Sequence, residues 1–168
     1  MLITETYKQL NQQLHSTCQD YGASGKKWAS VVKGIAEAMK TTDVLDYGCG
    51  KQKLRAELPY VIGYDPCIPG LDDKPSRSDL VVCTDVLEHI EPDCLDEVMN
   101  DLVRVTGSAL IATVATCKAL KVLADGRNAH LIVEQLDWWL PRFWHRFQIQ
   151  TVQNFGEEFL VIANSIPS

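Results

Sequence analysis

Short, continuous apolar runs alternate with stretches of helical periodicity along most of the chain. The runs occupy residues 44–47, 60–64, 80–83 and 109–114. Runs of this length are typical of strands that are buried on both faces, as in a parallel sheet. The pattern between them predicts a short helix near 51–58 and a longer one near 93–105, where Pro92 and Asp93 suit a helix start. Alternating strands and helices predict an α/β sheet with right-handed crossovers.

The first forty residues predict two helices. The stretch 4–18 is polar and rich in glutamine. Its apolar positions are three and four residues apart, at Tyr7, Leu10 and Leu14. Turn residues follow, and Ser24 can cap a second helix over about 26–40.

The last third of the chain predicts a helix and a hairpin. The aromatic-rich stretch 134–145 has the pattern of a helix that Pro141 interrupts. Strand-like runs at 147–154 and 158–164 flank turn residues, which predicts a C-terminal antiparallel hairpin. We expect residues 1–168 to form one domain, with 1–40 as its N-terminal helices.

Composition and charge narrow the class of protein. Hydrophobic residues make up 46% and charged residues 23%, and no apolar run approaches the roughly 20 residues of a membrane span. The net charge of −6 argues against a nucleic-acid partner, because such binding relies on Lys and Arg to neutralise phosphates. The six cysteines form no Cys-x-x-Cys pair, and the N-terminus lacks a secretory pattern, so we expect a cytoplasmic protein with free thiols.

The most informative stretch is 44–50, where an apolar run leads into Asp46, Gly48 and Gly50. Glycines after a parallel strand permit a tight turn and a close approach of a ligand to the backbone. Asp65 ends the next apolar run, where its carboxylate could accept two hydrogen bonds from a ribose. Neighbouring parallel strands end at the same edge, so the two sites can hold one nucleoside-containing cofactor. A structural turn at Asp65 is the alternative.

A dinucleotide site is a competing interpretation of this stretch. It would call for a third glycine where the chain has Lys53. Asp46 also disfavours a pyrophosphate through charge repulsion. A cofactor that carries a sulfonium and an α-ammonium suits this turn better.

These stretches resemble the motifs of class I S-adenosylmethionine-dependent methyltransferases. Residues 44–50 are similar to the first motif of that family, and Asp65 matches the acidic ribose-binding residue of its second strand. Residues 79–90, with Val-Leu-Glu-His at 86–89, are similar to its fourth-strand motif. The resemblance covers about 20–165 and implies a Rossmann-like class I sheet that is mostly parallel, with a C-terminal antiparallel hairpin.

The resemblance implies S-adenosyl-L-methionine as the cofactor. It assigns six residues to that cofactor: Asp46, Gly48, Gly50, Asp65, Thr84 and Asp85. The glycines would line the methionine part, the first aspartate would orient the ammonium, and the second would hold the ribose. The last two would face the sulfonium and the acceptor.

The chain also departs from the family pattern. Gln52 occupies the position of a third glycine. Only about thirteen residues separate Asp65 from Asp79, too few for the usual helix and third strand, so we expect that strand to be missing or vestigial. The residue that usually meets adenine has no clear counterpart, although Asp72 or Asp73 could substitute.

The loop 116–130 follows the last apolar run of the parallel sheet and therefore lies at the functional face. Its polar residues are Asp125, Arg127, Asn128 and His130. They predict an anion clamp, a substrate contact and a proton acceptor. The alternative is a solvated loop, with a turn at 125–126 and a helix cap from its asparagine.

Methyl transfer to an oxygen or nitrogen also requires removal of a proton, and histidine suits that task. We predict His130 as the base, aided by Asp125 and Arg127, with His89 as the second candidate. Tyr21, His89 and Asn128 are predicted to contact the substrate. A metal site of Asp85, Glu88, His89 and His130 is an alternative, but its spacing matches no firm ligand motif and we predict no metal.

The expected function is therefore S-adenosylmethionine-dependent methyl transfer to an oxygen or nitrogen nucleophile of a small-molecule or glycan-like acceptor. Two alternatives stay open. One is an enzyme that cleaves S-adenosylmethionine. The other is a non-catalytic cofactor-binding subunit, in a homo- or hetero-oligomer that covers the sheet edge left by the missing strand.

Overall fold

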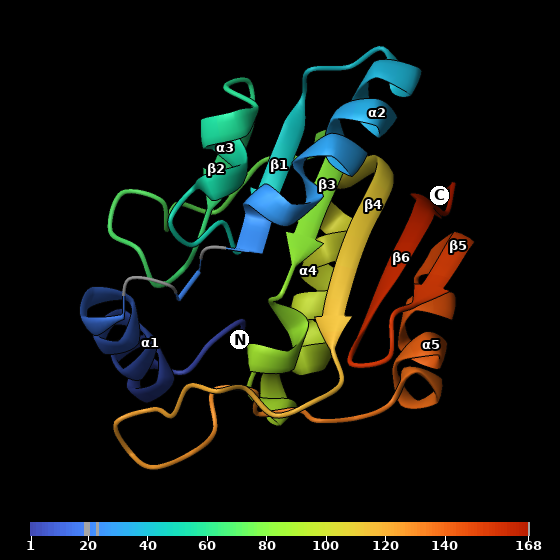
Figure 1. Cartoon of the computed structure of the whole chain (residues 1–168). Helices are drawn as coiled ribbons and strands as arrows, with labels where there is room; N and C mark the ends of the chain where they lie inside the picture. The colour runs from blue at the N-terminus through green and yellow to red at the C-terminus, as the bar shows by residue number, and fades with distance from the viewer. Residues whose placement is uncertain (19–20, 23, 168) are drawn as a thin grey trace.

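A six-stranded sheet forms the centre of the molecule in the computed structural model, which describes residues 1–18, 21–22 and 24–167 (Figure 1). Its strands are β1 (Val44–Tyr47), β2 (Ile62–Tyr64), β3 (Ser78–Thr84), β4 (Thr106–Ala115), β5 (Phe147–Asn154) and β6 (Glu158–Ser165). The spatial order is β2-β1-β3-β4-β6-β5. The first four strands pair in parallel, and β6 joins them antiparallel to both β4 and β5. The predicted parallel sheet and C-terminal hairpin are confirmed.

Helices cover both faces of this sheet. They are α1 (Glu5–Thr17), η1 (Ser24–Trp28), α2 (Ala29–Met39), α3 (Lys53–Glu57), η2 (Leu87–His89), η3 (Pro92–Cys94), α4 (Leu95–Val105) and α5 (Leu136–Trp144), where η marks a 3-10 helix. Figure 1 shows α2 in front of the sheet and α4 behind it.

Alternation along β3 explains the two layers. Val81 and Cys83 belong to the core cluster that includes α4 and α5, whereas Leu80 and Val82 belong to the cluster that includes α2 and α3. All four side chains are fully buried. Successive side chains of a strand point to opposite faces, so a strand between two helix layers must be apolar at every position.

The third strand of the usual class I sheet is absent from the described residues, as the short segment after Asp65 predicted. The chain turns back instead: Asp65 N donates to Leu71 O at 2.8 Å, and Leu71 N donates to Ile68 O at 3.0 Å. This leaves β2 at the sheet edge, with Ile62 58% exposed. A partner at this edge stays a prediction.

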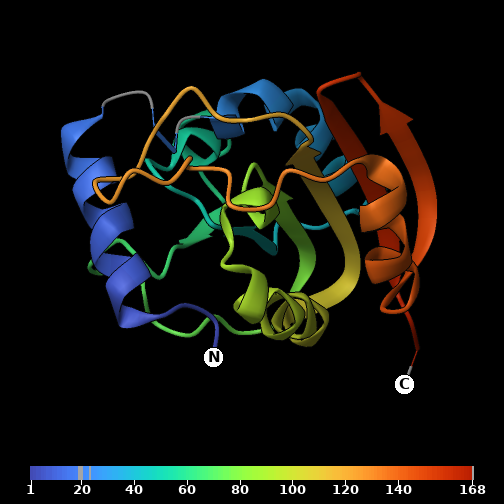
Figure 2. The same ribbon diagram turned by 90° about the horizontal axis from the view of Figure 1, so that it is seen from below.

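The N-terminal helices form with one correction. The second begins as η1, so Ser24 lies inside a 3-10 turn, and Trp28 stands at the cap position of α2 without a side-chain hydrogen bond. Ala23, part of the predicted turn, lies outside the described residues. Helix α1 stands beyond the carboxyl ends of the parallel strands, and the loop after β4 reaches across toward it (Figures 1 and 2).

Pro141 does not interrupt the predicted aromatic helix, because α5 continues through it to Trp144. A proline removes one backbone hydrogen bond. Trp139 and Phe143, four residues apart and fully buried in the core, hold the helix in place regardless. Among the described residues, no helix is long and apolar enough to cross a bilayer.

Candidate cofactor and acceptor site

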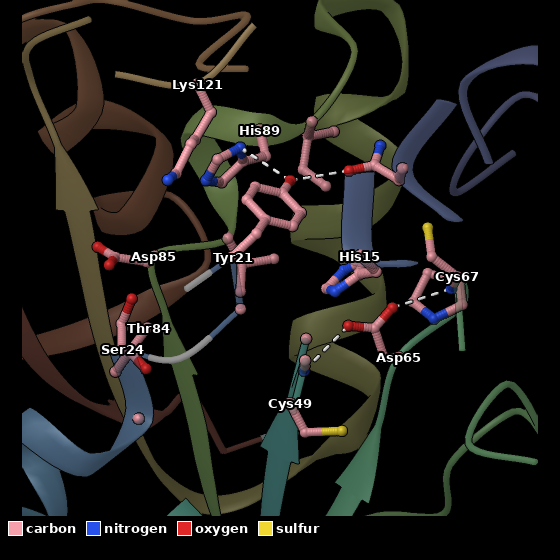
Figure 3. A pocket seen from close by; sticks show the side chains of 18 of the residues that line it. His15, Tyr21, Ser24, Cys49, Asp65, Cys67, Thr84, Asp85, His89 and Lys121 are labelled. Carbon is pink, nitrogen blue, oxygen red and sulfur yellow. Dashed lines mark hydrogen bonds between the residues drawn. The ribbon is translucent and has the colours of Figure 1, made fainter. Parts of the chain in front are cut away.

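A cavity of about 320 Å³ opens at the carboxyl ends of the parallel strands (Figure 3). Its walls come from the ends of β1, β2 and β3, from α1 and the turn after it, and from the loop after β4. The volume is at the lower end of the range for small-molecule sites. Parallel sheets bind ligands at this edge, so the cavity lies where the sequence placed the site.

Backbone conformation and space together require the two glycines of the turn after β1. Gly48 has φ 81° and Gly50 has φ 47°, both in the left-handed region. A Cβ at Gly48 would lie 2.4 Å from Val86 Cγ2, and one at Gly50 would lie 2.6 Å from Gly22 O. Both glycines line the cavity, so a ligand can reach the backbone here.

Gln52, at the position of the family's third glycine, adopts φ 54°. The backbone therefore keeps the glycine-type conformation although the residue has changed. Gln52 immediately precedes α3 and makes no side-chain capping hydrogen bond to that helix. Its half-buried side chain accepts a hydrogen bond from Arg55 Nη1 at 3.3 Å.

Asp65 ties the glycine turn to the end of β2. One carboxylate oxygen accepts from Gly50 N at 3.0 Å and the other from Cys67 N at 2.9 Å. The side chain is buried but lines the cavity. A carboxylate offers about four acceptor sites, so these two bonds leave capacity for ribose hydroxyls.

Three carboxylates give this end of the cavity a negative character. Asp46, Asp65 and Asp85 all line it. Burial, and then the charge of Asp65, raises the pKa of Asp46 to about 7. Asp85 sits just after β3 with φ 55°, and its backbone N–H donates to Thr113 Oγ1 at 3.2 Å. A cationic ligand group would relieve the repulsion among these carboxylates.

Helix α1 supplies a wall that sequence reasoning missed. Tyr7, Asn11 and His15, four residues apart, line the cavity. The Tyr21 hydroxyl donates to Asn11 Oδ1 at 2.8 Å, and Asn11 Nδ2 donates to Tyr7 O at 3.3 Å. The phenol of Tyr21 lies in the middle of the view in Figure 3. The sequence did contain a signal for this wall. Tyr7, Asn11 and His15 recur every four residues, so they share one face of the helix.

His89 and His130 both line the cavity, and Figure 3 shows His89 away from Asp65, with Tyr21 between them. The rings of His89 and His130 pack edge to face, with centroids 4.7 Å apart. His89 Nδ1 lies 2.8 Å from Ala129 O, and His130 Nδ1 lies 2.6 Å from Cys117 O. Burial, and then the neighbouring His130, lowers the pKa of His89 to about 4, so its ring is neutral. Lys121 lines the cavity as well.

Glu88 lies behind these histidines and is fully buried. Its Oε1 accepts from Ala115 N at 2.8 Å, whereas Oε2 has no hydrogen-bond partner among the described residues. Burial, and then the charge of Asp85, raises the pKa of the Glu88 carboxyl well above its usual range.

Three predicted site residues do not reach the cavity: among the described residues, its lining omits Asp125, Arg127 and Asn128. Asp125 accepts from Arg127 Nε at 2.7 Å and from its backbone N–H at 3.1 Å, so the two charges neutralise each other in an exposed turn. Asn128 Oδ1 accepts from the backbone N–H groups of Ala119 and His130, both at 3.0 Å, and its Nδ2 donates to Ala119 O at 2.8 Å. Asn128 therefore shapes the loop. The direct roles of these three residues in catalysis and acceptor binding stay a prediction.

An adenine contact by Asp72 or Asp73 stays a prediction. Asp72 pairs with Lys8 at 3.3 Å on the surface, and in the described part of the chain neither it nor Asp73 lines the cavity. The residues that do follow Asp65 in the lining are Pro66 and Cys67.

Comparisons with solved structures identify the fold. A 1,6-didemethyltoxoflavin-N1-methyltransferase from Burkholderia thailandensis, with bound 1,6-didemethyltoxoflavin and S-adenosylhomocysteine, is 12% identical with a TM-score of 0.70, over 99% of this chain and 92% of that one. The protein has the class I methyltransferase fold. No protein-family model and no curated protein match the sequence.

Two further structures agree with this fold. Magnesium protoporphyrin IX methyltransferase (ChlM) from Synechocystis PCC 6803, with bound S-adenosylhomocysteine, is 15% identical, with a TM-score of 0.67 over 95% of this chain and 100% of that one. The N-methyltransferase NodS from Bradyrhizobium japonicum WM9, also in complex with S-adenosylhomocysteine, is 13% identical, with a TM-score of 0.65 over 98% and 100%.

Proposed function

We propose that this protein transfers a methyl group from S-adenosyl-L-methionine to an oxygen or nitrogen nucleophile of a small-molecule or glycan-like acceptor. The observation that carries the proposal is the glycine turn with Asp46, Asp65 and Asp85 around one cavity of the class I methyltransferase fold. The methyltransferases of this fold described above bind S-adenosylhomocysteine in their crystals, which supports the same cofactor here.

The cavity has an end for each reactant. The turn at Gly48 and Gly50, with Asp46, suits the methionine part, and Asp65 suits the ribose. Thr84 is the last residue of β3 and Asp85 follows it, and both line the cavity where we expect the sulfonium and the acceptor to meet. The acceptor then lies beside Tyr21, His89 and His130.

The proposed reaction, where cofactor and acceptor meet, is a displacement at the methyl carbon. The acceptor lone pair forms the new bond to carbon while the carbon–sulfur bond breaks and S-adenosylhomocysteine leaves. Alignment of nucleophile, carbon and sulfur can supply roughly 7–11 kcal/mol of the barrier. The Nδ1 atoms of His89 and His130 face backbone carbonyls, so their Nε2 lone pairs are available to the acceptor's proton.

Calorimetric titration with S-adenosylmethionine and S-adenosylhomocysteine tests the cofactor. We expect the wild type to bind both, and Asp65→Ala to weaken binding at least tenfold, because two ribose hydrogen bonds are lost. Asp72→Ala is the matched control, since that carboxylate pairs with Lys8 outside the cavity. Absence of binding by the wild type at millimolar cofactor would refute the proposal.

Product analysis separates the catalytic alternatives. Incubation with labelled S-adenosylmethionine and a mixed acceptor library should move label to an acceptor and leave S-adenosylhomocysteine. Cofactor breakdown without an acceptor would instead identify a cleaving enzyme. Tight binding without either product would identify a cofactor-binding subunit.

Two broader expectations belong with this proposal. Both core clusters pack on one sheet, which supports a single domain over 1–168. Cys49, Cys67, Cys83, Cys94 and Cys117 are free thiols, which supports a reducing, cytoplasmic setting.

A further inference from the structure

Glu88, His89 and His130 place three ligand atoms of metal-binding type within 4.8 Å of one another. The first two come from η2, directly after β3, and the third comes from the loop after β4, 41 residues beyond His89. No local spacing motif links them, and this is why the sequence analysis named them only as part of an alternative metal site.

Both imidazoles are oriented as metal ligands are. Each Nδ1 lies at hydrogen-bond distance from a backbone carbonyl, that of Ala129 for His89 and that of Cys117 for His130. A carbonyl can only accept, so each Nδ1 carries the proton and each Nε2 keeps its lone pair. This outer hydrogen bond to a carbonyl fixes the tautomer and ring orientation of histidines that bind metals.

The carboxylate provides an independent indication. Glu88 is fully buried, and its Oε2 has no hydrogen-bond partner among the described residues. An unpaired carboxyl oxygen in the interior is costly, and such groups are normally paired or bound to a metal. Glu88 Oε1 is already held by Ala115 N at 2.8 Å, which fixes the side chain.

We propose that Glu88, His89 and His130 bind one divalent transition-metal ion of the zinc class in the wall of the cavity. Two imidazoles and one carboxylate are the ligand set of many catalytic zinc sites, which keep a further position open. Tetrahedral bonds of about 2.1 Å place ligand atoms about 3.4 Å apart, so atoms within 4.8 Å of one another must approach by at most about 1.4 Å.

The open position of the ion faces the acceptor. His89 and His130 line the cavity, whereas Glu88 lies behind them without reaching it among the described residues. The ion would therefore present its free position to the cavity and favour an acceptor with an oxygen ligand, such as a hydroxyl.

The role of the ion in catalysis rests on the proposed methyl transfer, whereas metal binding itself does not. With both Nε2 lone pairs bound to the ion, the two histidines do not accept the acceptor's proton; instead, a bound hydroxyl loses its proton to water more readily, because the ion stabilises the resulting oxyanion. That oxygen then forms the bond to the methyl carbon as the carbon–sulfur bond breaks.

Metal titration of the full chain, after treatment with a chelator, tests the site. We expect one Zn²⁺ per chain by calorimetry, and visible absorption bands of tetrahedral character when Co²⁺ is used instead. His130→Gln and Glu88→Gln should each weaken Zn²⁺ binding at least about 100-fold, since even outer-shell changes cost 10–100-fold. His145→Gln, an exposed histidine at the end of α5, is the matched control.

Thermal unfolding with and without Zn²⁺ covers the case in which Glu88→Gln does not fold. The wild type should gain stability from the ion, and His130→Gln should not. Failure of the wild type to bind the ion, or equal binding by His130→Gln, would refute the site. Calorimetry with S-adenosylmethionine on the metal-free protein keeps this outcome separate, because a lost metal site leaves the cofactor end intact.

Discussion

At the scale of single residues, the raised pKa of Asp46 is the main electrostatic feature of the cofactor end. Its pKa of about 7 in the unliganded protein reflects burial first and Asp65 second. An ammonium placed beside it favours the charged carboxylate, so the bound state has a lower pKa than the free state. Binding near neutral pH therefore releases a proton.

The first prediction follows from this linkage. Between the lower pKa of the complex and pH 7, the affinity for S-adenosylmethionine should fall by about tenfold for each unit of decreasing pH, and it should level off above pH 7. Calorimetry from pH 5.5 to 8.5 measures the slope. Asp46→Asn should bind S-adenosylmethionine weakly, and its affinity should lose this dependence on pH. Any pH dependence that the wild type and Asp46→Asn share comes from the titration of the cofactor itself. Equal slopes would contradict the assignment of Asp46.

Gln52 carries a second prediction at this scale. A residue other than glycine in the left-handed region destabilises the fold by roughly 1–2 kcal/mol. Glycine avoids this strain, but it loses more conformational entropy on folding, so the net gain is smaller. Gln52→Gly should therefore raise the free energy of unfolding by about 0.5–1 kcal/mol, measured by urea denaturation. Lys40→Gly is the comparison, because Lys40 has φ 56° at the end of α2, far from the cavity. A destabilised Gln52→Gly would mean that its side chain supports the turn.

At the scale of elements, the loop after β4 shows where sequence reasoning stopped. The density of polar residues indicated function, but it could not show that Asp125 and Arg127 neutralise each other. It also could not show that Asn128 bridges Ala119 and His130. Which polar groups a loop uses for itself depends on its closed conformation, and no periodic pattern encodes that.

Asn128 gives a graded third prediction. Its side chain makes three hydrogen bonds within the loop, two as acceptor and one as donor to Ala119 O. Asn128→Asp keeps the two acceptors, whereas Asn128→Ala loses all three. Amide hydrogen exchange over 117–130 should be slowest in the wild type, faster in Asn128→Asp and fastest in Asn128→Ala. Methyl transfer should fall in the same order, while affinity for S-adenosylmethionine stays near that of the wild type. Unchanged exchange in Asn128→Ala would show that the loop is held by other contacts.

The strands and most helices could be predicted because their signals are local. β3 is apolar at every position from 80 to 83 since both faces are covered there, and α4 has apolar residues at helical spacing. The exceptions were set by tertiary contacts. Buried Trp139 and Phe143 carry α5 through Pro141, and the start of α2 is a 3-10 turn rather than a serine cap.

At the scale of the whole molecule, the two halves of the site differ in how far they can be predicted. The cofactor half follows from residues that a strand–turn–helix unit brings together, so 44–50 and Asp65 were accessible from the sequence. The acceptor half depends on contacts between α1, η2 and the loop after β4. Tyr7 and His15 have no local motif, and Glu88 and His130 could be grouped from the sequence only as an alternative metal site; the assembled fold places them together.

Helix α1 closes the cavity and is held to the rest of the molecule by few polar contacts. Thr4 donates from its backbone N–H at 2.9 Å and from its hydroxyl at 2.8 Å to the carboxylate of Glu91. The Tyr7 hydroxyl donates to His89 O next to this pair. The Glu91 carboxylate therefore links the start of α1 to the segment that follows β3.

The fourth prediction is that Glu91→Ala loosens this wall without disturbing the sheet. Hydrogen bonds to a charged group contribute about 1.5–3 kcal/mol, so amide protection in α1 should fall by roughly ten- to a hundredfold while the core strands keep theirs. Hydrogen exchange with mass spectrometry measures both regions in one experiment. Asp93→Ala is the control, an exposed carboxylate two residues away. Bound S-adenosylmethionine should restore the protection in α1, because Tyr7, Asn11 and His15 line the cavity it would fill. Loss of protection in α1 and the sheet together would instead show that the helix and the sheet unfold as one unit.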